Sequence, residues 1–324
     1  MSTPQPSPNL SPHLSETGDL GERFRVVRDH DLGGVAHGMA DWVDSWAAGM
    51  EARGVRRTHD SIADFVTYVN NWYNPVFYHH IPPNHDLVAK SHRITKIVYE
   101  SIKSSNPVDV PYHLPLPVDH YNAADYQFQN IYPMPRRNRV RRVLDFGAGF
   151  GRQANLWTQM IPDPVYCAVD AIANGYCSQH EYYRRFPDVP LFDYIDDPEG
   201  FSMREQRGIY HLPTWRFDLL PDDFFDLAIC VHVLPELDEP LIQYVLDNLT
   251  RVLKPGARLY IRDHDDGPGH DLDTNTELAA RGFVMEFHPY LRDFSDILGI
   301  PRLLRKLDPA IANRGYRSPR ACVD

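Results

Sequence analysis

One stretch near the middle of the chain constrains the fold most, because three glycines occupy alternate positions directly after an apolar run. Residues 143–151 read V-L-D-F-G-A-G-F-G, which places Gly147, Gly149 and Gly151 behind an acid. The apolar residues suit a buried parallel strand, and glycine lets the backbone turn where a Cβ would collide with a bulky ligand. Good helix formers fill residues 152–160. The pattern therefore predicts strand, tight turn and helix, the unit at which α/β folds bind nucleotides.

The spacing of these glycines separates two kinds of nucleotide site. The dinucleotide fingerprint, G-x-G-x-x-G, needs its third glycine one position beyond Gly151, where this chain has Arg152. The pattern acid-x-G-x-G-x-G, beginning at Asp145, resembles motif I of the class I S-adenosylmethionine-dependent methyltransferases. A glycine-rich turn without a ligand is the alternative. The resemblance implies a cofactor contact for Asp145, Gly147, Ala148, Gly149 and Gly151.

Three later segments follow in the order found in the same family. Asp170 stands nineteen positions after Gly151, where an acceptor-only side chain can bind both ribose hydroxyls; nicotinamide enzymes share this spacing. Residues 217–230, F-D-L-L-P-D-D-F-F-D-L-A-I-C, are similar to the family's D-x-x-x-L-P-x-x-x-F-D-L-V segment. Residues 253–261, L-K-P-G-A-R-L-Y-I, are similar to its L-K-P-G-G-x-L turn.

The resemblance assigns ligand contacts at two of these segments. It implies that Asp218 meets the adenine amino group of the cofactor, and that Ala171 and Leu219 line the site beside the two acids. Asp226 would start a strand, and an acid at a strand edge without a ligand contact is the preferred interpretation for it. The segment around residues 126–129, Y-Q-F-Q, could cover the methionine end of the cofactor with Gln127 or Gln129.

Alternating short apolar segments and helical segments from residue 139 onward predict an α/β fold with a parallel sheet. We expect a Rossmann-like, doubly wound, mostly parallel sheet with an N-terminal helical cap. Strands are predicted at residues 140–146, 165–169, 225–231 and 258–262, and helices at 29–53, from 60, at 85–104 and at 241–253. The predicted domains are a disordered tail (1–20), a cap and connector (21–138, extended and proline-rich from 106 to 137) and a methyltransferase domain (139–324).

The composition of the chain limits which kinds of molecule it is expected to bind. The formal net charge is −11, which disfavours a long contact with a phosphate backbone, so we expect a small-molecule substrate and no nucleic acid. The sequence contains no apolar run long enough to cross a membrane. Its four cysteines show no C-x-x-C spacing, which favours reduced thiols, a cytoplasmic location and no metal cluster. A homodimer remains open.

Two histidines at predicted strand ends are candidates for a general base, because histidine has a suitable unperturbed pKa. His232 follows the strand at 225–231, and His264 follows the strand at 258–262 within the run Arg262-Asp263-His264. Asp263 could orient His264 or share its role. The alternative for His232 is a cofactor-lining or packing residue, and for His264 a histidine in a polar surface loop.

An aromatic cluster in the N-terminal region is the candidate acceptor site. Residues 70–80, N-N-W-Y-N-P-V-F-Y-H-H, place Trp72, Tyr73 and Tyr78 near a proline kink. Such side chains can line an apolar or aromatic acceptor, although ordinary core packing explains them equally well. The neighbouring histidines lack a nearby cysteine or glutamate, so no metal is predicted there.

These observations together predict the transfer of a methyl group from S-adenosylmethionine to a small molecule. A hydroxyl oxygen is the favoured acceptor, and the cap and connector resemble enzymes of natural-product biosynthesis. Carbon or nitrogen methylation stays open, since the sequence shows no motif that specifies the acceptor atom, such as N-P-P-Y. A non-catalytic cofactor-binding protein and a nicotinamide oxidoreductase are the alternatives from other classes.

Overall fold

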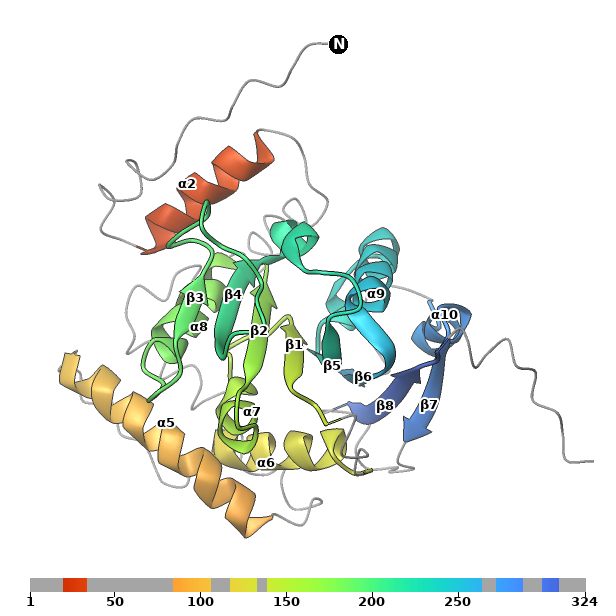
Figure 1. Ribbon diagram of the computed structural model, residues 1–324, viewed down its shortest axis with the longest axis horizontal. Helices are drawn as coiled ribbons and strands as arrows, with labels where there is room; N and C mark the ends of the chain where they lie inside the picture. The colour runs from red at the N-terminus through yellow and green to blue at the C-terminus, as the bar shows by residue number, and fades with distance from the viewer. Residues whose placement is uncertain are drawn as a thin grey trace, which may run out of the picture. The chain divides into compact units, whose positions relative to one another are not determined.

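The computed structural model describes residues 20–33, 84–105, 117–132, 139–263, 272–287 and 299–308. In these residues the strands form a mixed, mostly parallel sheet with helices alongside it (Figure 1), in the order β3-β4-β2-β1 up to residue 221 and β5-β6-β8-β7 after it. This confirms the predicted Rossmann-like fold. The chain divides into two compact units, Met1–Pro221 and Asp222–Asp324, which are described separately below. The predicted domain boundary between residues 138 and 139 stays a prediction.

The first unit contains four parallel strands. β1 pairs with β2, and β4 pairs with both β2 and β3. Side chains of β2 and β4 are buried along their whole length, as expected for the interior of a parallel sheet. The first strand begins two residues later than predicted. The bounds are β1 Arg142–Phe146, β2 Val165–Asp170, β3 Leu191–Asp193 and β4 Gly208–Pro213.

The helices of this unit confirm one predicted cap helix, the one expected from residue 85. The first described helix begins at Leu20, and most of the helix predicted at residues 29–53 lies outside the described residues. Residues 34–83, including the helix predicted from residue 60, lie outside the described residues. The bounds are α2 Leu20–Leu32, α5 His85–Ser105, α6 Pro117–Gln129, α7 Ala154–Met160, α8 Ala173–Tyr183 and η3, a 3₁₀ helix, Thr214–Leu219.

Helix α6 corrects the prediction of an extended connector from residue 106 to residue 137. Pro117 occupies the first helical position, where a missing N–H costs no hydrogen bond. The inner face of the helix carries polar side chains, among them Asp119 and Asp125, which are 0% exposed. Ser91 and Thr95 of α5 donate to Asp119 at 2.7 and 2.8 Å. Apolar residues such as Val118, Tyr121 and Ala123 are buried beside these polar ones, so the segment shows no clear apolar periodicity and the sequence pattern does not reveal the helix.

The second unit contains the remaining four strands. β5 and β6 are parallel, whereas β8 runs antiparallel to both β6 and β7. Helix α9 begins after Asp238, whose carboxylate accepts the backbone N–H of Leu241 at 3.1 Å and caps the helix. The bounds are β5 Phe225–Val231, η4 Leu234–Glu236, α9 Glu239–Val252, β6 Leu253–Asp263, α10 Thr274–Ala280, β7 Phe283–Phe287 and β8 Ile300–Lys306. Among the described helices, none is long and apolar enough to span a bilayer.

Candidate functional site

The turn after β1 depends on glycine at each of its three positions. Gly147, Gly149 and Gly151 have φ angles of 68°, 58° and 74°, in the left-handed region that other residues rarely adopt. A Cβ on Gly149 would meet no atom within 4 Å, so the space beside this residue is open. A Cβ on Gly151 would lie 2.5 Å from the hydroxyl of Tyr183 on α8. The second glycine therefore faces open space, and the third is required by helix packing.

Asp170, the last residue of β2, joins this turn to helix α8. Its Oδ2 accepts the backbone N–H of Gly149 at 3.1 Å and the side-chain amide of Gln179 at 2.7 Å, and its Oδ1 accepts the N–H of Ile172 at 3.0 Å. Burial raises the pKa of this carboxyl, against these three hydrogen bonds. A carboxylate offers about four acceptor positions. Among the described residues, one position on Oδ1 remains for a ligand hydroxyl.

Asp145 lies inside the sheet. Asp145 is only 2% exposed. The Tyr166 hydroxyl on the adjacent strand donates a hydrogen bond to its Oδ2 at 2.5 Å. Burial raises the pKa of Asp145 to about 7, although the Tyr166 hydrogen bond and the Arg152 charge oppose the shift. Ala148, in the turn itself, is 7% exposed. The carboxyl of Asp145 thus supports the strand beneath the turn.

The 3₁₀ helix η3 carries the predicted adenine contact. Asp218 is exposed, and its carboxylate pairs with the guanidinium of Arg216 at 3.1 Å. Phe217 anchors the segment, because its ring packs 5.6 Å from that of Phe146 at the end of β1. Leu219 is half-buried, as is Ala171 after β2. The helix therefore presents Asp218 outward on an anchored backbone.

The two glutamines of α6 differ in their surroundings. Gln129 is 1% exposed, accepts the indole N–H of Trp157 at 2.7 Å and donates to Gln153 at 3.3 Å, so its amide is used in packing. The Oε1 atom of Gln127 is buried, and no described residue donates a hydrogen bond to it. A buried acceptor of this kind costs about 1–3 kcal/mol unless a ligand supplies the donor. Gln127 therefore fits a contact with the ammonium end of a bound amino-acid moiety.

Arg152, the residue that breaks the dinucleotide fingerprint, fixes the beginning of α7. Its guanidinium donates to Asp125 of α6 at 2.5 Å and lies 5.8 Å over the ring of Tyr121. The neighbouring Gln153 amide donates to the same carboxylate oxygen at 3.1 Å. Because both helices supply buried polar groups, α6 holds the helix that follows the glycine turn.

All three predicted catalytic residues belong to the second unit, and two of them, His232 and Asp263, are among its described residues. His232 has a φ of 57° and donates its backbone N–H to the Arg262 carbonyl at 2.9 Å. Asp263 is 5% exposed and lies 3.5 Å from the guanidinium of Arg302 on β8. Burial raises the pKa of Asp263 to about 6, while Arg302 and the backbone amides of Val233 and His232 oppose the rise. The Asp263 carboxyl thus lies near the backbone that carries His232, and neither of its oxygens accepts a hydrogen bond from the described residues.

The remaining predicted site residues are Asp226, which the structure describes, and four residues that it does not describe. Asp226, the second residue of β5, forms an ion pair with Lys254, and its interpretation as a strand-edge acid without a ligand contact stays a prediction. His264, Trp72, Tyr73 and Tyr78 lie outside the described residues. Their roles as base and as acceptor site therefore stay predictions.

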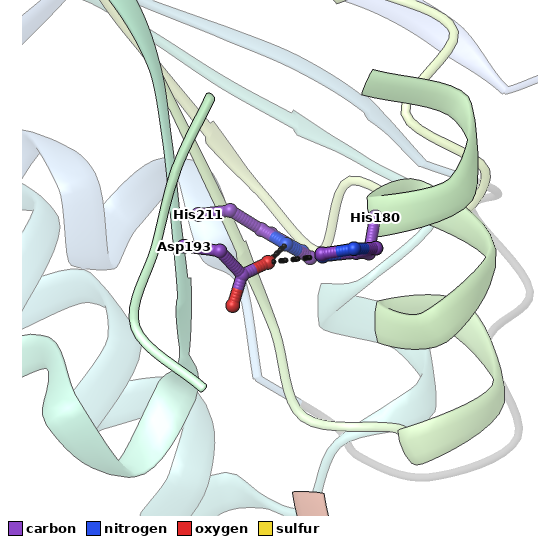
Figure 2. Close-up of side chains that lie close together, drawn as sticks. All are labelled: His180, Asp193 and His211. Carbon is purple, nitrogen blue, oxygen red and sulfur yellow. Dashed lines mark hydrogen bonds and ion pairs between the residues drawn. The ribbon is translucent and has the colours of Figure 1, made fainter. Parts of the chain in front are cut away.

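Sequence reasoning missed a buried polar cluster behind Asp170. His180 on α8, Asp193 on β3 and His211 on β4 lie together, and their side chains are 8%, 1% and 0% exposed. Figure 2 shows both imidazoles directed at the same carboxylate. The signal in the sequence was a histidine within the apolar strand segment I-Y-H-L. Its partners are far apart along the chain, so the sequence pattern does not join them.

Comparisons with known proteins agree with this geometry. A family model described as "Methyltransferase domain" matches residues 119–295, more than half of the chain. A curated relative, the tRNA N(3)-cytidine methyltransferase METTL2 of Gallus gallus, is 27% identical over 145 residues, which make up 42% of this chain and 34% of that protein. The match thus spans about a third of the relative's length.

Solved structures of similar fold include an S-adenosylmethionine-dependent methyltransferase from Methanosarcina mazei. It is 18% identical, covers 54% of this chain and 98% of its own, and has a TM-score of 0.36. The N-methyltransferase NodS from Bradyrhizobium japonicum, in complex with S-adenosyl-L-homocysteine, is 15% identical, covers 65% and 100% of the two chains, and has a TM-score of 0.43. By the extent of the family match, the chain belongs to the methyltransferase-domain family, and its cofactor is S-adenosylmethionine.

Proposed function

We propose that this methyltransferase transfers the methyl group of S-adenosylmethionine to a hydroxyl oxygen of a small molecule, of the kind made in natural-product biosynthesis. The observation that carries the proposal is the glycine turn: Gly149 leaves open space beside a backbone whose N–H is held by Asp170. Gln127 adds a buried acceptor in the same unit. The −11 net charge of the chain favours a small acceptor over a polyanion.

Each of these residues has a distinct task toward the cofactor. The turn at Gly147, Gly149 and Gly151 would accept the amino-acid part, Asp170 would accept a ribose hydroxyl, and Asp218 would accept the adenine amino group. The sulfonium supplies an activated methyl group, so the protein mainly orients the acceptor and excludes water. Where the acceptor is a neutral hydroxyl, His264 or His232 would remove its proton, and Asp263 would orient His264 or share its role.

Calorimetry with S-adenosylhomocysteine and with NAD tests the cofactor site. We expect the first ligand to bind and the second to give no heat, because Arg152 occupies the position of the third glycine in the dinucleotide pattern. If NAD bound and S-adenosylhomocysteine did not, the chain would instead be a nicotinamide oxidoreductase. Binding of S-adenosylhomocysteine without methyl transfer to any acceptor would instead favour a non-catalytic binding protein.

Methyl transfer from isotopically labelled cofactor tests the acceptor. The label should enter phenolic, sugar or carboxylate compounds and leave mixed tRNA unlabelled. The tRNA is included because a relative that matches over about a third of its own length is a tRNA methyltransferase. If the tRNA became labelled, the substrate would be a nucleic acid and not a small molecule. Label retained at nitrogen or carbon in the product would keep the substrate class and change the acceptor atom.

Two further properties belong to the same proposal. We infer a cytoplasmic location, because four cysteines without C-x-x-C spacing favour reduced thiols, which are typical of that compartment. A homodimer stays open, and light scattering of the purified chain measures it.

A further inference from the structure

Behind Asp170, a continuous chain of buried hydrogen bonds connects the glycine turn to the cluster drawn in Figure 2. The Gln179 amide nitrogen lies 2.7 Å from both the Gly149 carbonyl and Asp170 Oδ2. Its oxygen lies 2.8 Å from His211 Nε2, and His211 Nδ1 lies 2.7 Å from Asp193 Oδ2. Gln179 and His211 are 0% exposed. The central members of the chain are therefore shielded from solvent.

The acceptors at the two ends determine where the protons lie. A backbone carbonyl can only accept, so the Gln179 atom facing Gly149 must be the NH₂ group, and the atom facing His211 must be the amide oxygen. That oxygen requires an N–H at His211 Nε2. Asp193 requires another at Nδ1, because its four acceptor positions also receive His180, the Tyr176 hydroxyl and the Ile195 N–H. Both ring nitrogens of His211 therefore carry a proton.

The charges around His211 are consistent with this state. Asp193 on β3 faces it directly, and Asp170 on β2 lies beyond Gln179. Helix α8 contributes His180, which shares the Asp193 carboxylate, and the Tyr176 ring stacks 3.7 Å from the His211 ring. The two histidines and their hydrogen bonds hold the pKa of Asp193 well below its usual range, despite burial. Asp193 is thus an ionised carboxylate that accepts hydrogen bonds from both imidazoles.

We propose that His211 is a buried imidazolium whose Nε2–H fixes the orientation of the Gln179 amide, and thereby positions Asp170 and the Gly149 backbone for the cofactor. The inference rests on the proposed cofactor site at the glycine turn. If Nε2 lost its proton, the amide could turn over, and its oxygen would face two acceptors, the Gly149 carbonyl and the Asp170 carboxylate. His211 is therefore a positioning residue that acts through Gln179.

The protonation state can be observed without cofactor by NMR of the full chain with ¹⁵N-labelled histidine. His211→Gln identifies the His211 signals by their loss. We expect directly bonded protons on both ring nitrogens at pH 8, protected from exchange by burial. One protonated nitrogen would overturn the proposal. Stoichiometric zinc or another divalent metal in the purified protein, with the Nδ1 protons of His180 and His211 missing, would also overturn it and would identify a metal site.

The coupling to the cofactor is tested with substitutions of Gln179. In Gln179→Glu a carboxylate replaces the donor that faces Asp170, so S-adenosylhomocysteine affinity at pH 8 should fall at least about tenfold, the effect of a lost charge-assisted hydrogen bond. Affinity should recover as the pH is lowered and the introduced carboxylate takes up a proton. Gln179→Met should be weak at every pH. Gln206→Glu, an exposed position in the same unit, is the matched control and should bind like the parent.

The outcomes separate this inference from the cofactor site itself. A parent protein that fails to bind S-adenosylhomocysteine refutes the cofactor site, and the NMR result on His211 then stands by itself. A parent that binds, together with Gln179→Glu of equal affinity and no pH recovery, refutes the positioning role. Circular dichroism of each variant shows that a loss of binding is not a loss of fold.

Discussion

At the scale of single residues, two glycines of the turn after β1 are needed for different reasons, which the sequence pattern does not distinguish. Gly149 borders open space, whereas Gly151 is constrained by the Tyr183 ring. The pattern indicates that glycine is needed at both positions, because a left-handed backbone favours it. It contains no information about which neighbour excludes a side chain, since Tyr183 is distant in sequence.

Gly149→Val should abolish binding of S-adenosylhomocysteine while leaving the protein folded. The branched side chain would occupy the open space beside the turn and would strain a backbone at φ 58°. Gly282→Val is the matched control, because Gly282 also has a positive φ, 84°, and open space around it. Both variants should lose similar stability in urea unfolding, and only the first should lose the ligand. Equal ligand affinity in the two would remove Gly149 from the site.

Asp170→Ala should weaken S-adenosylhomocysteine by about 1.5–3 kcal/mol, the range for a hydrogen bond to a charged group. The substitution removes the acceptor position on Oδ1 and the partner of the Gly149 N–H. Isothermal titration at pH 8 measures the change. An unchanged affinity would mean that Asp170 only supports the turn.

His232→Gly separates a backbone requirement from a side-chain role. Non-glycine residues at a positive φ cost about 1 kcal/mol, so this variant should be as stable as the parent or more stable, despite the lost imidazole. If His232 is the base, kcat should fall at least about tenfold in both His232→Gly and His232→Ala, with ligand affinity unchanged. A kcat that falls only in His232→Ala would assign the effect to backbone strain.

At the scale of elements, apolar periodicity predicted β1, β2 and β5 well, placed only the end of β6, and missed β3, β4 and helix α6. The β5 bounds, Phe225–Val231, coincide with the predicted strand, and α5 ends one residue beyond the predicted position. These elements bury apolar faces, which a sequence displays directly. Helix α6 buries Asp119 and Asp125 among its apolar residues, and the partners of these acids, on α5 and just before α7, become visible only in three dimensions.

Arg152→Met should destabilise the α6–α7 contact by about 3–5 kcal/mol, because it leaves the buried Asp125 carboxylate without its cationic partner. The double variant with Asp125→Leu should recover most of that loss, since no buried charge remains. Urea unfolding of the two single variants and the double variant gives the coupling between the two positions. Strictly additive effects would show that the ion pair contributes nothing to helix docking.

At the scale of the whole molecule, the family and fold were predictable from four short segments, whereas the catalytic arrangement was not. The segments are local in sequence, so their order alone indicates the family. The two candidate bases depend on how distant strand ends are arranged, and His264 lies outside the described residues. The Gln179–His211–Asp193 chain similarly joins α8, β4 and β3 through contacts that no local pattern encodes.

The free energy of unfolding should decrease as the pH rises from about 4 to 7. Asp145 and Asp263 have pKa values of about 7 and 6 in the folded chain, above the unfolded value of about 3.9. The folded state therefore binds more protons in this window, and the stabilisation is complete below pH 4 and lost through pH 7. Asp145→Asn should flatten the decrease and keep the Tyr166 hydrogen bond. Chemical denaturation at several pH values measures the free energy of unfolding of both proteins. If it fell with pH as steeply in Asp145→Asn as in the parent, the raised pKa of Asp145 would be contradicted.

The contact between Gly151 and Tyr183 has a consequence for how this chain can vary during evolution. A methyl group at position 151 would collide with the Tyr183 ring, so the two sites cannot accept enlargements independently. A lineage that gains alanine at 151 must first, or at the same time, acquire a smaller side chain at 183. The third glycine of the turn should therefore show covariation with a residue of helix α8, whereas Gly149 should be invariant wherever the cofactor is retained.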